Sequence, residues 1–157
     1  MNPVGQLLTL DDIRLDFDAS LPKQVLGEIA TLLAARNGLT REIILESLMT
    51  REQLGSTGMG HGVAIPHARM PRCATPAGAF VRTKVPIAFG APDGKPVSVF
   101  LGLIVPDKAM EGHLQLLAAA AAMFSDRSFR GALKTNPDAA QVRDLLAAWS
   151  EAGATPA

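Results

Sequence analysis

The sequence predicts an α/β fold in which a β-sheet lies between layers of helices. Helical and strand-like segments alternate along the 157 residues without an internal repeat. The run VSVFLGLIV at 97–105 is almost continuously apolar, which is typical of a central strand that is covered on both faces. Because 48% of the residues are apolar and 19% are charged, we expect one domain over 1–157, ordered from about 5 to 150, with a frayed tail at 151–157.

The N-terminal segments indicate a pair of helices. Scattered apolar residues in the first twenty positions resemble a short strand followed by a loop. A helix is then expected with Ser20 as its cap, and Gly38 supplies a left-handed stop. A second amphipathic helix is expected from Thr40 to about Arg51. The two helices are predicted to pack against each other as an antiparallel pair.

The segment at 55–62, GSTGMGHG, holds four glycines in eight residues. Neither a helix nor a central strand tolerates this composition well, so a loop is predicted. Residues 63–65 form a short strand by expectation, and Pro66 keeps the residue before it extended. His67 therefore follows directly on a rigid support.

The C-terminal half supplies the rest of the sheet and its covering helices. A strand at 78–89 is expected to be broken by Pro86, and a turn follows at 91–96. The central strand at 97–105 ends at Pro106. The remaining helices are expected at 113–124, at 125–133 and from Asn136 toward Trp149.

Composition excludes several classes of function. Fifteen basic residues balance fifteen acidic ones, so no field gathers nucleic acid or anionic lipid. A single cysteine excludes an internal disulfide framework and fits a reducing compartment. The N-terminus lacks the pattern of a signal peptide, and the most apolar stretch, 114–124, is too short to span a bilayer. We therefore expect a cytoplasmic protein without membrane insertion.

Gly58, Gly60 and Gly62 form a G-x-G-x-G pattern. A Walker loop needs Lys and then Ser or Thr after its last glycine, and the dinucleotide fingerprint must open a helix. Here the glycines lead into a strand that ends at Pro66. The composition favours a flexible loop over a nucleotide site.

Cysteine and metal chemistry are also poorly supported. If Cys73 were the nucleophile of a phosphatase, an arginine would be needed six positions later, but the chain has Ala79 there. His61, His67 and His113 are an alternative set of ligands for a catalytic metal. The helical spacing of paired ligands is missing, however, so a histidine-ligated metal site is the weaker hypothesis.

His67 and His113 have the surroundings that phosphoryl chemistry needs. A neutral imidazole nitrogen beside the glycine loop, with Arg69 and Arg51 as cations, suits a nucleophile that accepts an anion. His113 is expected near a helix N-terminus, where the dipole favours anions. If the strands before both histidines run parallel, both residues emerge at one sheet edge.

These residues carry a resemblance to a known family. The segment REQLGSTGMGHGVAIPHAR, from Arg51 to Arg69, and the segment EGHLQLL, from Glu111 to Leu117, resemble a IIA component of the bacterial phosphoenolpyruvate-dependent sugar phosphotransferase system. The similarity is to the mannitol/fructose class and is greatest to its nitrogen-regulatory branch. The resemblance implies a three-layer sandwich with a mixed sheet of about five strands between helices.

The resemblance also implies roles for individual residues. His67 would accept a phosphoryl group from an HPr-like histidine phosphocarrier, with a tele-phosphohistidine as one form of the intermediate. Arg51 would stabilise the phosphoryl group, and His113 would assist. Neither a cofactor nor a metal is implied.

Further residues are candidates for docking. Those for the phosphate-binding loop or for docking are Ser56, Thr57, Gly58, Met59 and Arg69. Met59 and Met70 are candidates for an apolar patch on which a protein donor docks, and His61 is expected to be a bystander.

Two functions are compatible with the resemblance. In the first, the phosphorylation state of His67 regulates partner proteins of nitrogen or carbon metabolism and potassium handling. In the second, the protein passes phosphate to a separate sugar-specific IIB domain during fructose or mannitol uptake.

Overall fold

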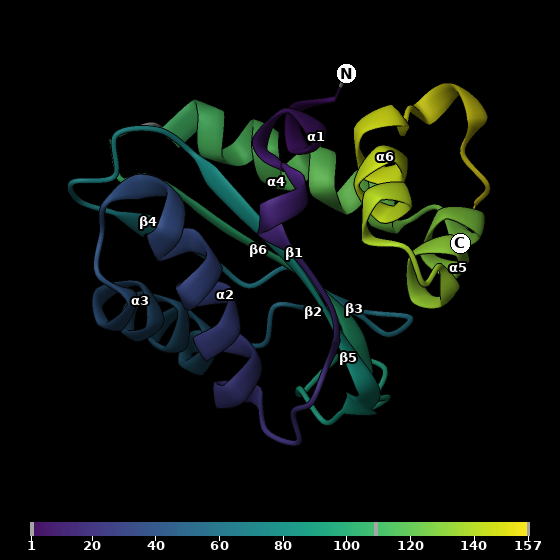
Figure 1. Ribbon diagram of the computed structural model, residues 1–157, viewed down its shortest axis with the longest axis horizontal. Helices are drawn as coiled ribbons and strands as arrows, with labels where there is room; N and C mark the ends of the chain where they lie inside the picture. Colours follow the sequence, from purple (N-terminus) through teal and green to yellow (C-terminus); the bar gives the residue numbers. More distant parts are fainter. Residues whose placement is uncertain (1, 109, 157) are drawn as a thin grey trace.

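The computed structural model describes residues 2–108 and 110–156, which form six α-helices and a six-stranded sheet (Figure 1). The helices are α1 (Pro3–Leu7), α2 (Pro22–Asn37), α3 (Arg41–Leu54), α4 (Met110–Phe124), α5 (Arg127–Thr135) and α6 (Ala139–Ala148). The strands are β1 (Ile13–Phe17), β2 (Gly58–Gly60), β3 (Val63–Ala64), β4 (His67–Met70), β5 (Ala77–Ile87) and β6 (Val97–Pro106).

The sheet is mixed, as predicted, and has one strand more than expected. Its order is β1-β5-β6-β3-β2, and β4 also pairs with β6. Strand β5 runs antiparallel to β6, whereas β3 and β4 both run parallel to it, one after the other. Pro66 lies between them, and its carbonyl accepts a hydrogen bond from the amide of Leu103 at 2.9 Å. One interrupted strand therefore follows β6 as far as its end.

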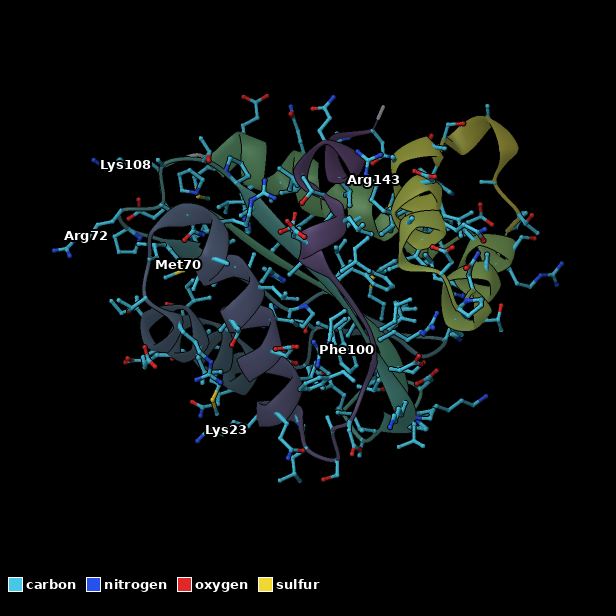
Figure 2. All side chains as sticks on the ribbon, in the orientation of Figure 1. Lys23, Met70, Arg72, Phe100, Lys108 and Arg143 are labelled. Atoms are coloured by element: carbon cyan, nitrogen blue, oxygen red, sulfur yellow. The ribbon has the colours of Figure 1, made fainter. Side chains whose placement is uncertain are left out.

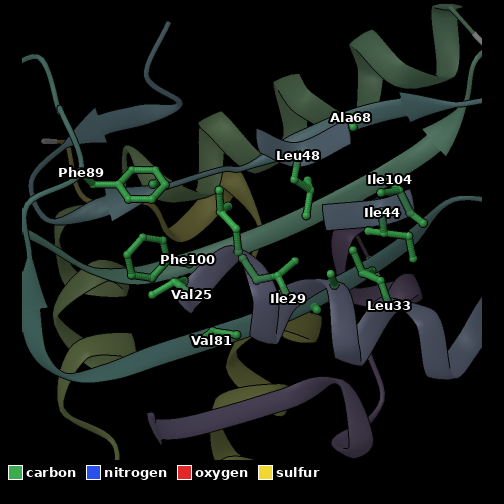
Figure 3. Close-up of a cluster of buried hydrophobic side chains, with 14 of the residues drawn as sticks. Val25, Ile29, Leu33, Ile44, Leu48, Ala68, Val81, Phe89, Phe100 and Ile104 are labelled. Atoms are coloured by element: carbon green, nitrogen blue, oxygen red, sulfur yellow. The ribbon is translucent and has the colours of Figure 1, made fainter. Parts of the chain in front are cut away.

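Alternate residues of β6 build two cores. Phe100 and Ile104 pack with α2 and α3 on one face of the sheet (Figure 3). Leu101 and Leu103 pack on the other face with residues of α1, α4, α5 and α6. The predicted three-layer arrangement is confirmed. Figure 2 shows Phe100 inside the molecule, while Lys23, Arg72 and Lys108 project from its periphery.

Two helix boundaries differ from the predictions because residues other than the expected ones cap these helices. Helix α2 begins at Pro22, and the Gln24 side chain accepts from the amides of Ser20 at 2.8 Å and Leu21 at 3.0 Å, so Ser20 is not the cap. Gly38, at φ 76°, ends this helix as predicted. Helix α6 is capped by the side chain of Asp138 rather than by Asn136.

The glycine-rich segment and the chain ends were only partly predicted. The segment expected to be a loop contains β2, an edge strand that pairs antiparallel with β3. The N-terminus begins with α1 and a 3-10 turn at Leu10–Asp12 before β1. Strand β5 continues through Pro86 with a shift in register between Arg82 and Ile87, instead of breaking. The tail carries a 3-10 turn at Glu151–Gly153.

Within 2–108 and 110–156, none of the helices combines the length and the apolar character needed to cross a membrane.

Candidate phosphoryl-transfer site

A cavity of about 890 Å³ opens between α3, β4 and the first turns of α4. Arg51 reaches it from the last turn of α3, and His67 and Arg69 line it from β4. His113 enters from α4. The structure therefore brings together the four residues for which the sequence suggests phosphoryl chemistry.

The register of β4 explains which side chains reach the cavity. His67 pairs with Leu103, and Ala68 pairs with Ile104. Paired residues on neighbouring strands point to the same face of a sheet, so His67 shares the face of Leu103, which α4 covers. Ala68 and Met70 belong to the core beneath α2 and α3. Because side chains alternate along β4, the ring of His67 stays partly exposed while the side chains of Ala68 and Met70 are buried.

The ring of His67 is fixed by a single backbone group. Its Nδ1 lies 2.7 Å from the carbonyl oxygen of Ile65. A carbonyl only accepts hydrogen bonds, so the neutral ring carries its proton on Nδ1 and keeps a lone pair on Nε2. Burial lowers the pKa of His67, the hydrogen bond to Ile65 raises it, and the charge of Arg51 lowers it, with a net decrease. The ring is therefore a neutral nucleophile near pH 7.

His113 lies beside His67, with 5.7 Å between the ring centroids. Burial lowers the pKa of His113, and the charges of His67 and Arg69 lower it further. Its Nδ1 is buried and has no hydrogen-bond partner among the described residues. An unpaired buried polar atom costs stability, so it is unusual in a group with a purely structural role.

Arg51 is tied to the chain segment that follows its helix. Its Nη1 donates to the carbonyl of Gly55 at 2.8 Å. The adjacent Glu52 accepts from the amide and the hydroxyl of Thr57, at 2.8 and 2.6 Å. The end of α3 is thus clamped to the glycine-rich segment, which holds Arg51 near His67.

Ser56, Thr57, Gly58 and Met59 do not line the cavity. The Ser56 hydroxyl donates to the carbonyl of Phe89 at 2.9 Å and accepts from the amide of Gly58 at 3.0 Å. These two hydrogen bonds help to shape the segment that carries β2. Met70 is fully buried, so the prediction that it lies on a docking patch is wrong.

An apolar rim around the cavity was missed from the sequence. It consists of Ile43 and Leu54 on α3, and Met110 and Leu114 on α4, which are 48%, 81%, 52% and 62% exposed. Because these four side chains come from two separate helices, only the packing of α3 and α4 around β4 shows that they share one surface.

The structure does not support the metal and cysteine alternatives. Within the described ranges, His, Cys, Asp and Glu side chains do not assemble in threes that could hold a metal ion. His61 lines a different cavity from His67 and His113. Cys73 is buried, its thiol donates to the carbonyl of Thr75 at 3.1 Å, and burial raises its pKa. A thiol in this setting is unreactive.

Comparison with known proteins assigns the chain to a family. Residues 6–149 match the family described as phosphoenolpyruvate-dependent sugar phosphotransferase system, EIIA 2. The chain belongs to this EIIA family. The family supports a role in phosphoryl transfer, with phosphocarrier and IIB-type proteins as the kinds of partner.

Similar EIIA proteins include several nitrogen regulatory proteins. The one from Pseudomonas aeruginosa is 39% identical over 90% of this chain and 92% of its own length. That of Bradyrhizobium diazoefficiens is 34% identical over 92% and 95%, respectively. The crystal structure of nitrogen regulatory protein IIA-Ntr from Neisseria meningitidis is 43% identical, with a TM-score of 0.87 over 91% of this chain and 98% of that one.

Proposed function

We propose that His67 accepts a phosphoryl group on Nε2 from the phosphohistidine of a small phosphocarrier protein, and that this modification regulates partner proteins. The observation that carries the proposal is the hydrogen bond from Nδ1 to the Ile65 carbonyl. This bond leaves the Nε2 lone pair free in a ring whose pKa is lowered. It thus supports a neutral, oriented nucleophile that faces a cavity.

The reaction balances without a cofactor. The Nε2 lone pair of His67 attacks phosphorus, and the N–P bond of the donor breaks with its electron pair returning to the donor nitrogen. The Nδ1 proton stays on His67 throughout. Catalysis of this exchange depends mainly on positioning and on stabilisation of the phosphoryl oxygens.

Arg51 and His113 serve the phosphoryl oxygens in this proposal. The charge of Arg51 already acts on His67 in the free protein, and a guanidinium retains unused N–H donors after bonding one carbonyl. The His113 ring lies 5.7 Å from the His67 ring, centroid to centroid, and its Nδ1 has no hydrogen-bond partner among the described residues. Arg69 adds a second guanidinium group to the lining of the cavity.

The apolar rim supports a protein as the donor. Ile43, Leu54, Met110 and Leu114 surround the cavity with exposed apolar surface, as is usual at the centre of protein interfaces. Two proteins must dock to align their histidines. A free small-molecule donor would gain little from such a rim.

The relatives favour regulation over sugar transport. Nitrogen regulatory proteins match over most of both chains. We therefore propose regulation of nitrogen or carbon metabolism and potassium handling, in the cytoplasm, with a separate IIB domain as the alternative acceptor.

Labelling with a phosphorylated HPr-like carrier tests the acceptor. Wild-type protein is expected to gain acid-labile phosphate, and His67→Ala is expected to gain none. Full labelling of the variant would refute the assignment.

A capture experiment separates regulation from transport. The phosphorylated and unphosphorylated forms are compared for binding of cytoplasmic partners, because about two added negative charges change recognition. Regulation predicts partners that bind only one form. Transfer of the label to a IIB domain, with partner capture that is independent of phosphate, would support the transport alternative instead.

A further inference from the structure

A second cavity, of about 490 Å³, lies beside α5. It shares no lining residue with the cavity at His67, and α5 and β4 lie on opposite sides of the molecule (Figure 1). Its walls carry four cations, namely Lys95, Arg127, Arg130 and Lys134. None of the described residues that line it is acidic. The phosphoryl-transfer reaction uses none of these groups.

The ion pairs found among the described residues include none of these four cations. One carboxylate, that of Asp93, acts on two of them: its charge raises the pKa of Lys134, and the charge of Lys95 lowers the pKa of Asp93. Asp93 also accepts from the amides of His61 at 2.9 Å and Lys95 at 3.1 Å, and it balances only part of the positive charge. A chain with no net charge therefore concentrates positive charge in one hollow.

Helix α5 supplies most of this charge from one face. Arg127, Arg130 and Lys134 are spaced at i, i+3 and i+7, which places them on the same side of the helix. Arg130 is only 5% exposed. Its Nη1 donates to the carbonyl of Phe124 at 2.9 Å, and its other N–H groups have no hydrogen-bond partner among the described residues. These N–H groups are not among the buried atoms that lack a partner, so they reach the cavity that Arg130 lines, where the oxygens of an anion can accept from them.

The wall of the cavity that His61 and Gly62 form packs closely against Lys134 of α5. Its Nζ donates to the carbonyl of His61. Gly62 is left-handed, at φ +79°, and a Cβ built there would lie 2.9 Å from the same Nζ. Burial and the charge of Arg130 lower the pKa of Lys134. The exposed Lys134, one turn along α5 from Arg130, is thus held against the turn at His61 and Gly62.

From this arrangement we infer that the cavity at α5 binds a small anion that carries two or more phosphate groups. Two guanidinium groups suit the paired oxygens of phosphates. Four cations on two walls exceed the charge of a single phosphate. The volume of about 490 Å³ falls within the usual size of small-ligand sites. The inference does not depend on the role of His67.

A titration with inorganic pyrophosphate, followed by amide chemical shifts at about 0.1 M salt, tests this inference. We expect saturable shifts around Gly62 and Lys134 with a dissociation constant of about 1 mM or tighter. Inorganic phosphate is expected to bind at least about tenfold more weakly than pyrophosphate. Shifts confined to residues around His67 would overturn the inference, as would equal affinity for both anions.

Matched variants locate the site. Lys134→Gln and Lys95→Gln are each expected to weaken pyrophosphate binding about tenfold, whereas Lys84→Gln, an exposed lysine outside the cavity, removes the same charge without effect. The amide spectrum of each variant shows that it is folded. Equal weakening by all three would indicate general electrostatic attraction and contradict a built site.

Discussion

His67 combines a fixed proton with a lowered pKa. The Ile65 carbonyl holds the proton on Nδ1, while burial and Arg51 disfavour a second proton on the ring. A histidine with only one of these two features would be a weaker nucleophile toward phosphorus. A protonated ring has no lone pair, and a free ring divides its proton between two nitrogens.

The first prediction concerns pH. Because the folded pKa of His67 lies below the ordinary value of about 6.5, the rate of phosphoryl acceptance should be constant from pH 7 to 8 and fall only below pH 6.5. Arg51→Gln removes a nearby positive charge and should raise this pKa, as measured by NMR titration of the ring. The control Arg72→Gln, at an exposed residue outside the cavity, should leave it unchanged. A His67 pKa above 6.5 in wild-type protein would contradict the electrostatic account.

The second prediction separates function from stability at His113. Its buried Nδ1 has no hydrogen-bond partner in the described part of the chain, so His113→Leu should raise the free energy of unfolding by up to about 1 kcal/mol. The same change should slow phosphoryl acceptance about tenfold, which corresponds to about 1.4 kcal/mol in the barrier. Denaturant unfolding and single-turnover labelling measure the two effects. A variant that is less stable and equally active would show that His113 has a structural role only.

At this scale, the sequence predicted which residues lie together in the cavity better than it predicted the placement of their neighbours. Arg51, His67 and His113 meet in one cavity, as their motif suggested. Met70 was misplaced because a strand of four residues gives too short an alternation to show which side is buried. The cation cluster at α5 was not foreseen, since Lys95 and Lys134 are distant in sequence.

Two helices around one strand make the proposed docking surface. Helices α3 and α4 contribute the apolar rim, and β4 contributes the histidine between them. Helix α3 is held by the bonds of Glu52 to Thr57. The surface thus depends on how three elements meet.

The third prediction tests this surface. Leu54 is 81% exposed at the rim, so Leu54→Ser should raise the KM for the phosphorylated carrier about tenfold, the loss of a little over one kcal/mol of apolar contact. The maximal rate should change little because the chemistry is untouched. Leu21→Ser is the matched control, because Leu21 is 59% exposed at the N-cap of α2 and lies outside the cavity. Equal effects of both changes would remove the rim from the interface.

The fourth prediction concerns the contact of the central strand with α2. A Cβ on Gly102 of β6 would overlap Cγ2 of Ile29, so Gly102→Ala should destabilise the protein by about 1–3 kcal/mol. Gly131→Ala in α5 meets no atom within 4 Å and should stabilise it by about 0.5–1 kcal/mol. Thermal unfolding of both variants measures the difference. A neutral Gly102→Ala would show that α2 is free to move away from the sheet.

The long elements were predictable and the short ones were not. Helix α2 and strand β6 carry patterns long enough to fix their type. The three-residue strand β2 forms only because β3 supplies hydrogen-bond partners, and its glycines argue against a strand in isolation. The same holds for α1, whose five residues are too few to be stable without packing.

The whole molecule has no formal net charge. Arg51 and Arg69 share the lining of the His67 cavity with Glu46 and Asp107, whereas the described lining of the α5 cavity has four cations and no acidic residue. The proposed phosphorylation would add about two negative charges at the first of these cavities. From composition we expect no nucleic-acid partner, but composition could not show how the charges are distributed. That distribution depends on the tertiary fold.

The most direct test of the account determines which atom carries the phosphate. The phosphorylated protein, labelled with 15N on its histidine rings, is analysed for the coupling between phosphorus and ring nitrogen. The account predicts one phosphate, on Nε2 of His67, with the proton retained on Nδ1. Phosphate on Nδ1 of His67, or on any other residue, would contradict it.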